Sequence, residues 1–67
     1  MTLEKFLKKF VSGDTLIAIT YGYGEARPFE KHALTFDFIE KRGFFSVRCV
    51  EPKTDDGKPY LLITIGD

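Results

Sequence analysis

The first residues of the chain carry a helical pattern of apolar positions. Apolar side chains recur at i, i+3, i+4, i+7 and i+8, namely Leu3, Phe6, Leu7, Phe10 and Val11. Charged residues fill most of the positions between them, which is typical of an amphipathic helix with one face on a core. Thr2 is placed to cap this helix, and Ser12-Gly13 is expected to end it through a left-handed cap at the glycine.

Alternating or β-branched stretches predict two β-hairpins. Residues 15–21 (TLIAITY) have two largely apolar rows, as in a central strand. The turn Tyr21-Gly22-Tyr23-Gly24-Glu25 follows, and residues 26–31 return as a short edge strand, because Pro28 lacks an N–H. Residues 44–51 and 60–65 then form a second hairpin around Asp56-Gly57, a strong hairpin-turn dipeptide.

Residues 33–43 fit either a helix or a strand. Their apolar residues alternate over 34–38, as in a strand that would run over 33–39 and turn at 40–43. However, Thr35 is a good helix N-cap, Asp37 suits the first turn, and Lys41 and Arg42 suit the last turn before Gly43. These end signals favour a short helix over Thr35–Arg42, with the strand as the alternative.

The order of elements predicts one α+β domain spanning residues 1–67. It consists of an N-terminal helix, a β-hairpin, a short second helix and a C-terminal β-hairpin, with the helices on one face of a small, mainly antiparallel sheet. An apolar fraction of 43%, with 15% aromatic residues, is enough for a core and argues against disorder. The row of strand residues expected to face the helices is Ile17, Ile19, Phe45, Val47, Cys49, Leu61, Ile63 and Ile65.

Two short helices can shield only one side of the sheet, so the other side is the candidate binding surface. It is expected to show apolar residues together with tyrosine and arginine, the composition of many protein interfaces. The predicted partner-binding residues are Leu16, Tyr23, Arg48, Val50, Tyr60 and Leu62. The expected partner is a second copy of the chain or another protein; in the alternative, the second helix or the loop around Tyr23 covers this face.

Charge and aromatic residues define an alternative function, single-stranded nucleic-acid binding. Ten basic and ten acidic residues cancel, which argues against a general electrostatic nucleic-acid binder. A local site could still combine exposed rings with the lysines of the first helix: Tyr21, Tyr23, Phe44, Lys5, Lys8 and Lys9. Residues 42–49 partly match an RNA-recognition pattern but lack two of its three stacking aromatics.

The sequence contains no catalytic or metal-binding constellation. His32 is a lone histidine, and Cys49 is expected to be a small core side chain. Asp55-Asp56-Gly57 lacks the further ligands of a calcium loop and is expected only to form a turn. We therefore expect no enzyme activity, no cofactor and no metal. One unpaired cysteine, with no signal peptide and no apolar stretch of spanning length, indicates a cytoplasmic protein without a membrane segment.

The order of segments resembles that of small proteins encoded by bacterial phages and mobile elements. The similarity covers TLEKFLKKF, Gly13-Asp14-Thr15 with its apolar strand, DFIEKRGF, and the closing VRCVEP and YLLITI strands. The chain departs from that pattern at Gly22-Tyr23-Gly24 and Phe44-Phe45. The resemblance implies a non-catalytic protein that binds and modulates a host protein, as some inhibitors of CRISPR nucleases do; it carries over no catalytic residues.

Overall fold

The helix–hairpin–helix–hairpin order expected from the sequence is confirmed. The computed structural model describes residues 1–24 and 26–67, so Glu25 of the expected turn lies outside the described residues. In chain order the elements are α1 (Leu3–Phe10), β1 (Leu16–Thr20), β2 (Phe29–Glu30), the 3-10 helix η1 (Lys31–Ala33), α2 (Phe36–Arg42), β3 (Ser46–Asp55) and β4 (Lys58–Gly66). The strand alternative for residues 33–39 is therefore wrong.

Side-chain caps explain where both helices begin. The Thr2 hydroxyl accepts a hydrogen bond from the Lys5 N–H at 3.3 Å, and the Thr35 hydroxyl accepts one from the Phe38 N–H at 3.1 Å. The expected left-handed cap at Gly13 is wrong, because Gly13 does not have a positive φ. Instead α1 ends at Phe10, and the next residue, Val11, has an extended backbone and a side chain buried in the core.

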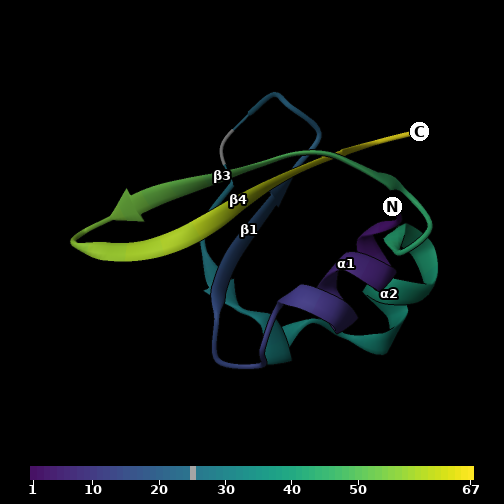
Figure 1. Ribbon diagram of the computed structural model, residues 1–67, viewed down its shortest axis with the longest axis horizontal. Coiled ribbons are helices and arrows are strands. Elements are labelled where there is room, and N and C mark those ends of the chain that lie inside the picture. The colour runs from purple at the N-terminus through teal and green to yellow at the C-terminus, as the bar shows by residue number, and fades with distance from the viewer. Residues whose placement is uncertain (25) are drawn as a thin grey trace.

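The four strands form one mixed sheet in the order β2-β1-β4-β3. Each predicted hairpin is antiparallel, with β1 beside β2 and β3 beside β4. The two hairpins join through a parallel pairing of β1 with β4, in which Ile17 lies beside Leu61 and Ile19 beside Ile63. Figure 1 shows α1 and α2 together on one side of these strands.

The core lies between the two helices and the sheet. Its buried side chains come from one face of α1, from β1 and from β4: Leu3, Leu7, Val11, Ile17, Ile63 and Ile65. Partly buried residues of α2, including Phe38 and Ile39, pack against this cluster. The row expected to face the helices is therefore found on the helix side, with Cys49 as the exception.

A β-bulge explains why Cys49 is not in the core. The register between β3 and β4 shifts between Val47 and Cys49, so that Val47 lies opposite Ile65 but Cys49 lies opposite Thr64. The extra residue moves every following side chain of β3 to the other face. Cys49 is consequently exposed, and Val50, opposite the buried Ile63, faces the helix side. The predicted placement of both residues is wrong for this one reason.

Candidate functional site

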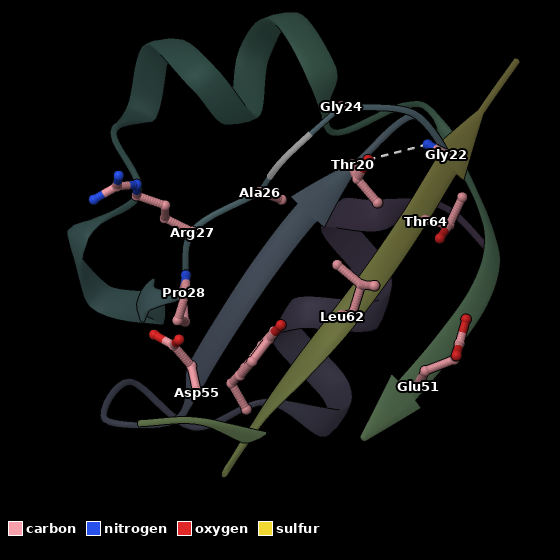
Figure 2. Close-up of a pocket in the computed structure, with 11 residues that line it drawn as sticks. Thr20, Gly22, Gly24, Ala26, Arg27, Pro28, Glu51, Asp55, Leu62 and Thr64 are labelled. Atoms are coloured by element: carbon pink, nitrogen blue, oxygen red, sulfur yellow. Dashed lines mark hydrogen bonds between the residues drawn. The ribbon is translucent and has the colours of Figure 1, made fainter. Parts of the chain in front are cut away.

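The face of the sheet opposite the helices is the candidate functional site, and we call it the open face. The strand register assigns to it the side chains that share a face with Leu62. These are Leu16, Ala18 and Thr20 of β1, Tyr60, Leu62 and Thr64 of β4, and Cys49, Glu51 and Lys53 of β3. In Figure 2, α1 lies behind the sheet and Leu62 points away from it, so neither helix covers this face.

The open face is hollowed over β1 and β4. The hollow has a volume of about 860 Å³ and is walled on one side by the segment that follows β1 and on the other by β3. In Figure 2, Arg27 and Pro28 stand along one side, Glu51 stands along the other, and Leu62 lies between them. The segment around Gly24 thus forms a wall of the hollow, not a lid over the whole face.

Four of the six predicted partner-binding residues lie on or beside the open face. Leu16, Tyr60 and Leu62 are half-buried members of it. Arg48, the bulge residue, is exposed and lies over Gly66, where its guanidinium donates a hydrogen bond to the backbone carbonyl of Asp67. Val50 is excluded from this face by the bulge.

Tyr23, the sixth predicted residue, lies in the turn beyond the end of β1. The Thr20 hydroxyl organises this turn by accepting a hydrogen bond from the Gly22 N–H at 3.1 Å and donating one to the Tyr23 carbonyl at 3.3 Å. The Tyr23 side chain is 78% exposed. It therefore belongs to the end of the sheet and does not line the hollow.

Both signs of charge surround the apolar centre of the open face. Glu51 and Lys53 form an ion pair of 3.6 Å along β3. Arg27 and Asp55 also line the hollow. The open face thus combines tyrosine and leucine with charges of both signs.

Two features of the edge strand β3 hinder the pairing of a further strand with the sheet. Residues at the N-terminus cover the start of β3: Thr2 bridges to Ser46, and the Val47 N–H donates to the Met1 carbonyl at 2.9 Å. Further along the same edge strand, Pro52 lacks an N–H for a further strand to bind. The start of this edge and the position of Pro52 are therefore closed to a further strand.

The aromatic residues of the alternative function do come together. Tyr21 stacks on Tyr23 with ring centroids 6.2 Å apart, Phe45 contacts Tyr21 at 5.7 Å, and Phe44 contacts Phe45 at 4.7 Å. The Arg42 guanidinium lies 5.9 Å from the Phe45 ring centroid. The sequence alone gave no sign that Phe45 would connect these rings.

The lysines of α1 are not all beside this aromatic group. Lys8 lines a hollow next to the start of β1, whereas Tyr21 follows the other end of this strand. Lys5 lies in the first turn of α1, where the Leu3 N–H donates to the Phe45 carbonyl at 2.8 Å. The rings thus have the start of α1 beside them, while Lys8 lies near the far end of β1.

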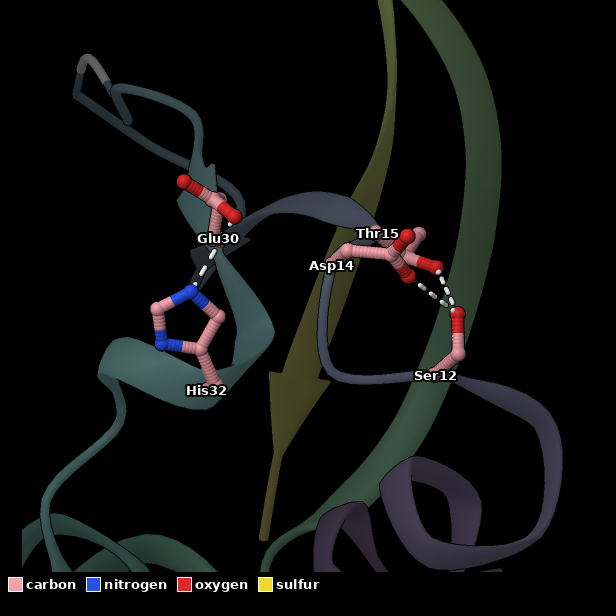
Figure 3. Close-up of polar contacts among 5 residues, drawn as sticks. All are labelled: Ser12, Asp14, Thr15, Glu30 and His32. Atoms are coloured by element: carbon pink, nitrogen blue, oxygen red, sulfur yellow. Dashed lines mark hydrogen bonds and ion pairs between the residues drawn. The ribbon is translucent and has the colours of Figure 1, made fainter.

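Further polar contacts lie near the turns on either side of β1. His32 Nε2 lies 3.0 Å from a carboxylate oxygen of Glu30, and Ser12 contacts both Asp14 and Thr15 (Figure 3). All these contacts are exposed. Within residues 1–24 and 26–67, no group of His, Cys, Asp and Glu is arranged to hold a metal ion. The described helices are also too short to cross a membrane.

Comparisons with protein families, curated proteins and solved structures found no match to this chain.

Proposed function

We propose that this protein is a non-catalytic protein-binding module that uses its open face, and that its first partner is a second copy of the chain. The observation that carries the proposal is the half-buried group of Leu16, Tyr60 and Leu62 on a sheet face without helical cover. Burying such a group against another protein removes apolar area from water, which is the main driving force of association.

The charges of the open face favour a second copy. Arg27, Arg48 and Lys53 lie on or beside the same face as Glu51 and Asp55, so it carries both signs. In a two-fold dimer each residue meets the same patch of the other copy, and a mixed patch can complement itself. A standard interface of about 800 Å² per partner would use about a sixth of the 4743 Å² surface of this chain.

The decisive variant is Leu62→Lys, because a lysine at this position is compatible with the neighbouring residue on β3. Leu62 lies directly opposite Glu51, so a lysine there gains an oppositely charged neighbour, whereas a glutamate would face a like charge. We expect the wild-type protein to be dimeric by multi-angle light scattering at micromolar concentration. We expect Leu62→Lys to weaken the dimer by about 30-fold or more, the loss typical of a central interface residue.

Phe36→Lys is the matched control. Phe36 is 82% exposed and lies on α2, on the helix side of the sheet. This variant makes the same change of charge and should leave the dimer intact. Circular dichroism of both variants checks that they fold. A wild-type protein that stays monomeric at several hundred micromolar, or equal dissociation by both variants, would overturn the homodimer.

A titration with single-stranded oligonucleotides tests the alternative function with the same protein. An affinity that falls steeply as salt rises, and that Tyr23→Ala and Phe44→Ala abolish, would replace the protein-binding proposal with nucleic-acid binding. For a protein-binding module, we expect no binding of these oligonucleotides at physiological salt.

A further inference from the structure

A second hollow lies on the helix side of the sheet, away from the open face. It has a volume of about 420 Å³ and opens between α2, η1 and the end of β1. Its walls are mostly apolar and include Ile19, Phe29, Leu34, Phe38 and Ile65. The volume falls within the range of about 300–1,000 Å³ that is usual for small-molecule sites.

The walls of this hollow are core residues that the fold leaves partly uncovered. Phe29, Leu34 and Phe38 pack against the buried cluster yet are only partly buried themselves. α2 is seven residues long, and only part of its apolar face reaches the sheet. An apolar group placed here would therefore contact the existing core without a rearrangement of the sheet.

One charged side chain, Arg42, lines the hollow among the described residues. No carboxylate of residues 1–24 and 26–67 lies within ion-pair distance of Arg42. Its guanidinium instead lies near the ring of Phe45, an arrangement that orients the group and leaves its N–H donors for an anion. The neighbouring cation of the same helix, Lys41, is already paired with Asp37 at 3.3 Å.

Two further polar groups come from Tyr21 and Thr35, which also line the hollow. The Thr35 hydroxyl is engaged by the Phe38 N–H as the cap of α2. Tyr21 is 42% exposed. The hollow is thus lined mostly by apolar side chains, with one cation and few other polar groups. None of the described lining residues is acidic.

We infer that this hollow binds an apolar group that ends in a single carboxylate, with the apolar part between α2 and β1 and the carboxylate on Arg42. Guanidinium binds carboxylate through paired N–H donors, which makes a carboxylate a better match than a neutral head group. Two sources share this chemistry: a free medium-chain or aromatic acid, and the C-terminus of a peptide that ends in an apolar residue.

Titrations of the full chain followed by amide NMR test this inference. We expect octanoate to shift the resonances of Leu34, Phe38 and Ile19. It should bind up to about 15-fold more tightly than hexanoate, since each of its two additional methylenes contributes about 0.8 kcal/mol when buried. Octan-1-ol, which has the same chain without the charge, should bind about fivefold more weakly than octanoate. Equal binding of hexanoate and octanoate would overturn the role of the hollow.

Arg42→Gln removes the charge, and Lys41→Gln is its matched control on the same helix. Arg42→Gln should reduce octanoate affinity about fivefold and abolish the preference over octanol, whereas Lys41→Gln should change neither. Equal effects of the two variants would show that net charge, not Arg42, attracts the anion, and would overturn the site.

Ala33→Leu tests the space itself. Ala33 is exposed and lines the hollow, so a larger side chain there should fill it and weaken octanoate binding without loss of the core. Unchanged affinity in this variant would place the ligand elsewhere.

Peptides distinguish the two sources of the ligand. A hexapeptide ending in Leu with a free carboxylate that binds more tightly than octanoate, and loses binding when amidated, assigns the site to a protein C-terminus. Binding of octanoate alone assigns it to a free acid. Binding of neither overturns the inference, and the homodimer of the open face is unaffected by that result.

Discussion

Gly43 is the position where the structure makes the sharpest prediction about stability. It follows α2, is buried, and has helical backbone angles with φ −63° and ψ −23°. Any residue can adopt these angles, so the glycine is not needed for its conformational freedom. It is needed for space: a Cβ at this position would collide with the backbone carbonyl of Ile39 and lie 3.1 Å from the Cβ of Glu4.

The close approach at Gly43 joins the two helices. The Gly43 N–H donates to the Ile39 carbonyl at 2.7 Å, and the Gly43 carbonyl accepts from the Glu4 N–H at 2.9 Å. An added methyl group therefore cannot be accommodated by moving a flexible side chain alone: the backbone at the end of α2 must shift away from the Ile39 carbonyl, and Glu4 of α1 must also give by a few tenths of an ångström. Overpacking of this kind typically costs about 1–3 kcal/mol.

The expected magnitude for Gly43→Ala is the difference between two effects. Alanine restricts the unfolded chain and thereby stabilises the protein by about 0.4–1 kcal/mol when the native backbone suits it. The overpacking cost is larger, which leaves a net destabilisation of about 1–2 kcal/mol. For a domain of this size, each 1 kcal/mol lowers Tm by about 4–8 °C. Differential scanning calorimetry should thus show a fall of roughly 5–15 °C.

Gly13→Ala is the matched control for Gly43→Ala. A Cβ at Gly13 would meet the Cβ of His32 at 3.6 Å, an ordinary contact, and its φ is not positive. This variant should therefore gain the effect on the unfolded chain and raise Tm by a few degrees. A Tm for Gly43→Ala equal to or above that of the wild type would refute the steric argument.

Two further variants test the cap and the core. Thr35→Ala removes the hydroxyl that accepts from the Phe38 N–H and should lower the free energy of unfolding by about 1 kcal/mol in urea titrations, whereas Thr35→Ser should retain most of it. Ile63→Ala leaves a cavity at a fully buried position of β4 and should cost about 3–4 kcal/mol, enough to unfold much of so small a domain at 37 °C; a cooperative Tm within a few degrees of the wild type would show that the core repacks.

Most predictions that depend on interactions between residues close together in the chain were confirmed. The period of α1, the threonine caps of both helices and the turn at Asp56-Gly57, where both residues have positive φ, all follow from interactions within a few residues of one another. The cap at Gly13 is the exception. There a long-range interaction, the burial of Val11 in the core, decided where the helix ends.

The candidate sites depended on contacts between distant segments. The parallel pairing of β1 with β4 has no local signature, because which strands pair is decided by competition among all strands of the chain. The bulge that places Cys49 and Val50 on the opposite faces from those expected also has no local signature. A one-residue shift in register leaves the alternating pattern of each strand unchanged.

The local pattern of residues was enough to predict the types of element, their order and a sheet with more apolar surface than two short helices can cover. Long-range packing was needed to place Leu62 and Tyr60 on one face with Glu51, and Arg42 beside a hollow with Ile19 and Ile65. The difference arises because backbone propensities and caps act over one turn, whereas a surface is assembled by packing among residues that lie far apart in the chain.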